Sequence, residues 1–165
     1  MKIIDITGRF LDNSLRRNSI EDLRIVFHWT ASSTAKSAID WLDTRLGGKG
    51  TVGYNYIIDR DGTIYVLADP GERWMHNSGL GANYDQNTIS ISLVMKDETD
   101  PVSQNQEYAS RQLLLDLNSK FEIKEITHHA HINRNKRDFP EKLWESFIAS
   151  VYSDFDISEY SKITT

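Results

Sequence analysis

Two apolar runs that lead into histidine constrain the fold of this chain more than any other feature. Residues 23–28 read Leu-Arg-Ile-Val-Phe-His, and the shorter run at residues 125–127, Glu-Ile-Thr, leads directly into His128. Short runs rich in branched and aromatic side chains are typical of buried β-strands. We therefore expect a histidine at the end of each strand, on a rigid sheet where the side chains that follow can converge.

The rest of the pattern interleaves strands with helices. Ser32-Ser33-Thr34 offers an N-cap for a helix, and Gly47-Gly48 is expected to end it. Residues 60–62, Arg-Asp-Gly, form a turn signal between two strands. The expected strands are 2–6, 23–28, 54–59, 63–67, 88–95 and 125–127, and the expected helices are 35–46, 104–121 and one after Pro140.

This order predicts an α/β domain with a single mixed central β-sheet and helices packed on it. Residues 1–22 are interpreted as an N-terminal arm, and the polar tail 155–165 is expected to be loose. The long irregular stretch at residues 69–87 is expected to be functional, because such loops are uncommon in compact domains. The tryptophans and leucines of the helices, including Trp41, are assigned to the core.

Composition narrows the choice of partners. The chain has 165 residues, which suits one domain, and its net charge is −5 with no basic block, so neither nucleic acid nor an anionic membrane is expected as a partner. Cysteine is absent, which excludes disulfides and thiolate ligands within this sequence. The N-terminus lacks a signal-peptide pattern, and no apolar run approaches a transmembrane length. We therefore expect a monomer that is made and folds in the cytoplasm.

A cluster of metal-ligating residues follows the second histidine-bearing strand. Residues 127–138 read Thr-His-His-Ala-His-Ile-Asn-Arg-Asn-Lys-Arg-Asp and hold three of the five histidines. Imidazole nitrogens and carboxylate oxygens are the usual protein ligands for zinc when thiolates are absent. We hypothesise that His28, His128 and Asp138 meet around one metal ion. His129 and His131 are assigned to solvent-facing or supporting positions.

Several motifs occur in an order that is specific when they are taken together. They are His-Trp-Thr at 28–30, Gly-Tyr-Asn-Tyr-Ile-Ile-Asp-Arg-Asp-Gly at 53–62, Trp-Met-His-Asn-Ser-Gly at 74–79, Ile-Ser-Ile-Ser-Leu at 89–93, and the histidine cluster with Lys136 and Asp138. This order resembles the zinc-dependent N-acetylmuramoyl-L-alanine amidases of the type-2 group. That group includes phage lysozymes, bacterial muropeptide-recycling amidases and animal peptidoglycan recognition proteins. The resemblance covers roughly residues 23–148.

The resemblance implies a role for individual residues. It implies one Zn²⁺ per chain, held by His28, His128 and Asp138, the last at a position that is cysteine in some members. Lys136 matches the catalytic lysine of the group, and Tyr54 matches the catalytic tyrosine of its phage lysozymes. Substrate contacts are expected from Trp29, Thr30, Trp74, His76 and Asn77. Ser92 stands where the recycling amidases carry a glutamate, which favours the phage lysozyme branch.

The activity that the resemblance implies is hydrolysis of the amide bond between N-acetylmuramic acid and L-alanine in peptidoglycan or a muropeptide. We expect residues 1–165 to be one catalytic domain, of the kind found in a phage or prophage endolysin. Other settings remain open, namely a cytoplasmic recycling amidase or a toxin delivered by a secretion device. Two other activities also remain open: a non-catalytic peptidoglycan-binding module, and a zinc hydrolase of another amide such as a stem-peptide bond.

Overall fold

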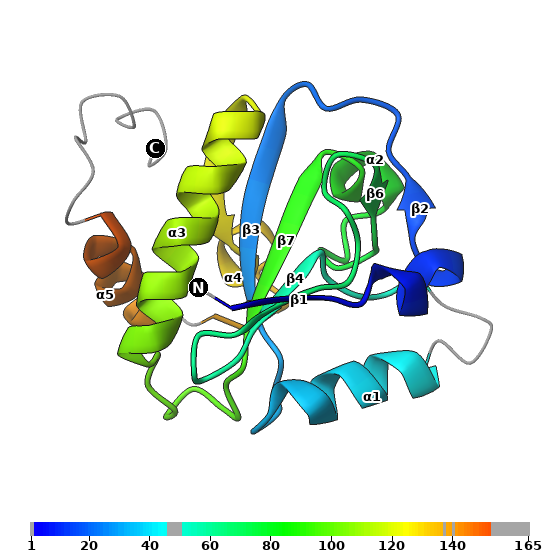
Figure 1. Cartoon of the computed structure of the whole chain (residues 1–165). Helices are drawn as coiled ribbons and strands as arrows, with labels where there is room; N and C mark the ends of the chain where they lie inside the picture. The colour runs from blue at the N-terminus through cyan, green and yellow to red at the C-terminus, as the bar shows by residue number, and fades with distance from the viewer. Residues whose placement is uncertain (1, 46–50, 137, 140, 153–165) are drawn as a thin grey trace.

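A computed structural model describes residues 2–45, 51–136, 138–139 and 141–152 of the chain (Figure 1). These residues form a six-stranded sheet with the strand order β1-β5-β4-β7-β3-β8 and a separate two-stranded sheet of β2 and β6. The strands of the large sheet are β1 (Ile3–Asp5), β3 (Leu23–Trp29), β4 (Tyr56–Ile58), β5 (Ile64–Val66), β7 (Thr88–Leu93) and β8 (Ile123–His128). The predicted α/β class is therefore confirmed.

Strand β3 lies inside the sheet and pairs in parallel with both β7 and β8. Strand β4 is parallel to β7 and antiparallel to β5, so the sheet is mixed, as predicted. The turn between β4 and β5 contains Gly62, whose φ of +83° is readily adopted only by glycine. Strand β1 pairs in parallel with β5 at the edge, so part of the expected N-terminal arm belongs to the sheet.

Helices cover the two faces of the sheet. Helices α3 (Gln104–Lys120) and α5 (Glu141–Tyr152) pack on one face in a shared core cluster (Figure 1). Helix α1 (Ala35–Arg45) packs on the other face with Phe10 of the 3-10 helix η1 (Thr7–Asn13). No helix in the described part of the chain is long and apolar enough to cross a membrane.

Local sequence explains where these helices begin. Ser103 accepts a hydrogen bond from the backbone N–H of Gln106, and the Gln106 side chain accepts one from the backbone of Ser103, which completes a capping box at the start of α3. The buried Gln106 amide also donates to the carbonyl oxygens of Ile58 and Val94, at 3.1 and 3.0 Å. The capped start of α3 is thereby fixed to strand β4 and to the segment that follows β7.

The stretch at residues 69–87 contains more structure than the sequence predicts. Strand β6 (Arg73–Trp74) pairs antiparallel with β2 (Leu15–Arg16), and α2 (Ala82–Asp85) is a single short turn of helix. Elements of two to four residues are too short to show a period in the sequence. The expected helix end at Gly47-Gly48 and the expected loose tail lie outside the described residues.

Candidate metal centre and active site

The alternation of side chains along the strands decides which residues can meet. Phe27 of β3 packs in the core against α5, so its neighbour His28 points to the opposite face of the sheet. In the parallel pairing of β3 with β8, Phe27 is opposite His128, so these two side chains share the α5 face. The chain then enters α4 (His129–Ile132), and His129 reaches the site at His28.

Three ligand atoms converge at this end of the sheet. His28 Nδ1 lies 3.0 Å from His129 Nδ1 and 3.1 Å from Asp138 Oδ2, and His129 Nδ1 lies 2.7 Å from Asp138 Oδ2. Ligands bound 2.0 Å from a tetrahedral zinc ion are about 3.3 Å apart, so these separations suit a single ion after small shifts. Both imidazoles are buried, whereas the Asp138 side chain keeps some exposure.

The hydrogen bond on the far side of His129 favours the ligand role of Nδ1. His129 Nε2 lies 2.9 Å from the carbonyl oxygen of Ser78, which can only accept, so Nε2 carries the proton and donates. Nδ1 is then free of its proton and faces His28 and Asp138. A metal-binding histidine typically donates its second ring N–H to such a carbonyl, which fixes the tautomer and the ring orientation.

Charge and burial set the protonation states that a metal needs. Burial lowers the pKa of His28 from its usual value, which favours the neutral imidazole. Burial alone would raise the pKa of the Asp138 carboxyl, but the His129 and His28 rings that face it outweigh burial and hold that pKa well below its usual range. Neutral imidazoles and an ionised carboxylate are the forms that bind zinc.

The structure does not bring His128 into this cluster, which corrects the ligand set expected from the sequence. His128 Nδ1 donates to the carbonyl oxygen of Phe139 at 2.8 Å, and its ring stacks on Trp144 with centroids 5.0 Å apart. The reason is the two-residue period of a strand, because a shift of one residue moves a side chain to the other face. His129 takes the place that the sequence analysis gave to His128.

A cavity of about 280 Å³ opens beside the cluster and contains most of the other expected site residues. Tyr54 and Lys136 line it together with Asp138 and His129, and the ring of Tyr54 lies 5.2 Å from that of His28. The expected substrate contacts Trp29, Thr30 and Asn77 also line this cavity. The remaining lining residues are Ala31, Trp41, Leu42 and Val52.

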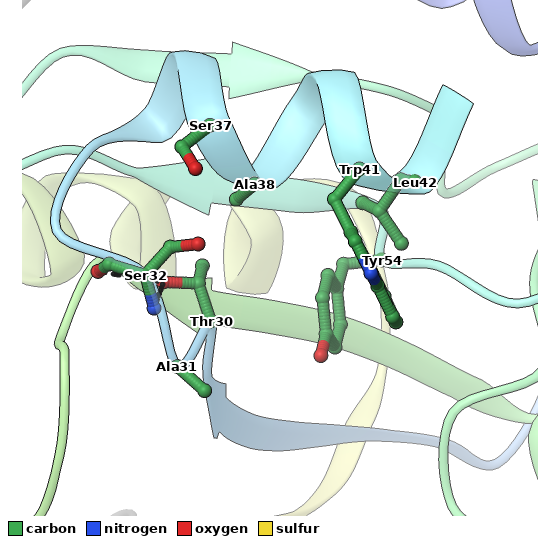
Figure 2. A pocket seen from close by; sticks show the side chains of 8 residues that line it. All are labelled: Thr30, Ala31, Ser32, Ser37, Ala38, Trp41, Leu42 and Tyr54. Carbon is green, nitrogen blue, oxygen red and sulfur yellow. Dashed lines mark hydrogen bonds between the residues drawn. The ribbon is translucent and has the colours of Figure 1, made fainter. Parts of the chain in front are cut away.

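A second cavity of about 230 Å³ shares five lining residues with the first and extends along α1 (Figure 2). Figure 2 shows the side chains of Trp41 and Tyr54 at one end of this cavity and the hydroxyl groups of Ser32 and Ser37 towards the other. Trp41 is 56% exposed, so its assignment to the core is wrong. Helical spacing alone does not show that Trp41 is exposed. Ala38 and Leu42 form the buried face of α1, and Trp41 lies outside that face.

Two other expected substrate contacts lie elsewhere. Trp74 is only 5% exposed, and its indole N–H donates to the carbonyl oxygen of Arg16, so the pairing of β6 with β2 makes it a core residue. His76 Nδ1 lies 3.0 Å from Oδ2 of the buried Asp85, whose second oxygen accepts from the backbone N–H of Ser78. Neither Trp74 nor His76 is among the residues that line the two cavities.

The Gly-Tyr-Asn-Tyr motif at residues 53–56 has a structural basis. Asn55 is fully buried, and its amide donates to the carbonyl oxygens of Ala68 and Arg73 while its side-chain oxygen accepts from Ser90. The asparagine thus joins the start of β4 to β7 and to the segment after β5. With Asn55 held in place, Tyr56 packs into the core and Tyr54 lines the cavity at the metal cluster.

Comparison with known proteins supports this reading of the fold. Residues 21–142 match the family model described as N-acetylmuramoyl-L-alanine amidase. A search of the curated proteins found no match. The solved structure of the endolysin amidase LysCS from Clostridium intestinale is similar, with a TM-score of 0.70, 20% identity, and coverage of 91% of this chain and 95% of that one.

Two further solved structures share the fold. Peptidoglycan recognition protein SA of Apis mellifera has a TM-score of 0.72 and 15% identity, with 99% of each chain covered. The Ph2119 endolysin from a Thermus scotoductus bacteriophage has a TM-score of 0.67 and 16% identity, with 91% of this chain and 99% of that one covered. The fold implied by the sequence resemblance is therefore confirmed.

Proposed function

Because the chain belongs to the N-acetylmuramoyl-L-alanine amidase family, we propose that it is a zinc-dependent hydrolase. Its substrate would be the amide bond between N-acetylmuramic acid and L-alanine in peptidoglycan. The observation that carries the proposal is the cluster of His28, His129 and Asp138, which lies beside a cavity that Tyr54 and Lys136 also line. We propose these five residues as the catalytic site, with His129 in place of His128.

The three ligands fit zinc by donor type, charge and spacing. One Zn²⁺ held by His28, His129 and Asp138 would keep a position open for water and lower the pKa of that water to about 7. The carbonyl carbon of the scissile amide would be attacked, so negative charge collects on its oxygen. The Lys136 ammonium stabilises that charge, and the Tyr54 hydroxyl donates a hydrogen bond to the same oxygen.

The side chains around the cluster suit an amide better than a glycosidic bond. Glycoside hydrolysis generally needs two carboxyl groups, one on each side of the scissile bond. Of the described residues that line the two cavities, only Asp138 carries a carboxylate, and that carboxylate faces both histidines. A cation and a hydroxyl beside a metal site instead suit a reaction in which one carbonyl oxygen becomes negative.

The second cavity gives the substrate room beyond the scissile bond. Trp41 offers an exposed aromatic face, and the hydroxyl-bearing residues Thr30, Ser32 and Ser37 line the same space. Binding sites commonly combine aromatic walls with a few polar groups in this way. We propose that this cavity holds the part of the glycan next to the cleaved amide, with Trp41 packing on a sugar ring.

We propose an endolysin of the phage or prophage type as the biological role. Ser92, which pairs with His28 across β3 and β7, stands where recycling amidases are expected to carry a glutamate. The main alternative is a peptidoglycan-binding protein without activity, since a recognition protein of Apis mellifera shares this fold. The full set of ligands, beside a cavity that is also lined by Lys136 and Tyr54, favours catalysis.

Digestion of purified peptidoglycan, followed by mass spectrometry and end-group analysis, tests the proposal. We expect new N-terminal amines on L-alanine, no new reducing sugar ends, loss of activity with a chelator and recovery with zinc. Binding without products would support the recognition protein. New reducing ends without new amines would identify a glycosidase, and amines on another residue would identify a different peptide bond as the target.

A further inference from the structure

A second group of potential metal ligands lies on the other face of β8. His128 at the end of β8, His131 in α4 and Glu141 at the start of α5 bring their ligand atoms within 4.8 Å of one another. His128 shares its face with Phe27 and α5, whereas His28 points away from it. The two clusters are thus separate sites, even though His128 and His129 are neighbours in the sequence.

One ring nitrogen of His128 points into this second cluster without a matching hydrogen bond. His128 is 1% exposed, and its Nε2 has no hydrogen-bond partner among the residues that the structure describes. Its Nδ1 already donates to the carbonyl oxygen of Phe139. In a neutral ring that donates from Nδ1, Nε2 carries a lone pair. That lone pair lies 3.1 Å from Oε2 of Glu141, which also accepts, so a cation between the two atoms would relieve the contact.

We propose that His128, His131 and Glu141 form a second zinc site with a structural role. Two imidazoles and one carboxylate are a donor set that zinc accepts, and the exposed sides of His131 and Glu141 leave room for water as a further ligand. This site shares no ligand with the catalytic zinc and takes no part in the proposed reaction.

The position of the site indicates what a bound ion would stabilise. His128 and Glu141 are at the two ends of the segment that carries Lys136 and Asp138. An ion that joins those ends closes a short loop in the folded state, and metal binding of this kind contributes directly to folding stability. The second zinc would therefore hold in place the segment that supplies the third ligand of the catalytic zinc.

Zinc counting by native mass spectrometry on the full chain tests the proposal. The wild-type protein should bind about two zinc ions, and Asp138→Ala should bind only the structural one. Glu141→Gln and His131→Gln should weaken the second ion at least about tenfold, the lower end of the cost of losing a supporting metal partner. Glu145→Gln, one helical turn further along α5 and also exposed, removes the same charge and should leave both ions bound.

Thermal unfolding of Asp138→Ala gives a second readout. Zinc should raise the midpoint of this variant, and the increase should disappear when Glu141→Gln is added. Circular dichroism in chelator checks that each variant folds. Equal zinc binding by wild type and Glu141→Gln would overturn the proposal. So would a loss of stability in Glu141→Gln that is the same in chelator and in zinc, because that result identifies a simple ion pair of protonated His128 with Glu141.

Discussion

Matched alanine substitutions at His128 and His129 provide the sharpest test of the catalytic ligand set. His129→Ala should abolish zinc binding at the catalytic site and amidase activity together, because it removes a ligand atom that lies 2.7 Å from Asp138 Oδ2 and 3.0 Å from His28 Nδ1. His128→Ala should keep the catalytic zinc and the activity, because its ring lies on the other face of β8. Adjacent residues thus give opposite outcomes.

The structure also sets the size of the stability loss expected for His128→Ala. The substitution leaves the buried carbonyl oxygen of Phe139 without its donor, which typically costs about 1–3 kcal/mol. It also removes the stacked contact with Trp144, and aromatic pairs contribute about 0.5–1.5 kcal/mol beyond their area. We therefore expect the free energy of unfolding to fall by about 2–4 kcal/mol. His128→Phe keeps a ring on Trp144, so it should lose only the contribution of the hydrogen bond to Phe139.

Urea unfolding in chelator measures these losses without any contribution from metal. Release of L-alanine amines then reports on the catalytic site alone. If His128→Ala loses the catalytic zinc while His129→Ala keeps it and stays active, the register of β8 is wrong and the ligand set expected from the sequence is right. A fall in stability below about 0.5 kcal/mol for His128→Ala would contradict the buried hydrogen bond and the stacking.

Three further predictions concern the catalytic site. Lys136→Ala and Tyr54→Phe should keep zinc and lower turnover by about 10²–10³, the usual cost of losing one oxyanion donor, as measured by amine release. Asp138→Ala should lose the catalytic zinc and the activity together, whereas Asp138→Cys should keep that zinc, because a thiolate is also an anionic ligand; an unchanged zinc content with full activity in Asp138→Ala would refute its role. Trp41→Ala should raise KM for polymeric peptidoglycan more than it lowers kcat, and unchanged KM would exclude stacking on the glycan.

The sequence is most informative about the fold where a run is long enough to show a period. Strand β3 reads as an apolar run because residues on both of its faces are buried. Strand β7 alternates polar and apolar residues, although all six of its residues are buried. The Asp61-Gly62 turn gave a further local signal that the structure bears out. The pairing of β2 with β6 could not be predicted, because it joins two-residue segments that lie far apart in the chain.

That long-range pairing explains the wrong assignment of Trp74, and the packing of α1 explains that of Trp41. Trp74 stands in a glycine-rich stretch that looks like a binding loop, but β6 turns its indole towards the backbone of Arg16. Trp41 stands on an amphipathic helix, yet the buried face of α1 is already filled by Ala38, Ile39 and Leu42. The exposure of a side chain depends on which other elements pack against it, and its neighbours in the sequence carry little information about those contacts.

The metal ligands were predictable by residue type but not by position. The sequence shows that histidines and an aspartate follow two strands, and it does not show on which side of β8 each of them lies. That side depends on the register between β3 and β8, which places Phe27 opposite His128. Given this register, the side-chain period of two assigns His128 to the core face and makes His129 the neighbour of His28.

The position of the third ligand, Asp138, depends on packing in the core as much as on the cavity itself. Asp138 is followed by Phe139, which is fully buried and has a φ of +56°, a conformation that costs a bulky residue about 1–3 kcal/mol. The ring of Phe139 packs against Phe27 and Phe147, and its carbonyl oxygen accepts from His128. These contacts offset the strain and set the position of Asp138 from the side opposite to His28. His128 therefore stabilises the backbone of Phe139 without being a ligand of the catalytic cluster.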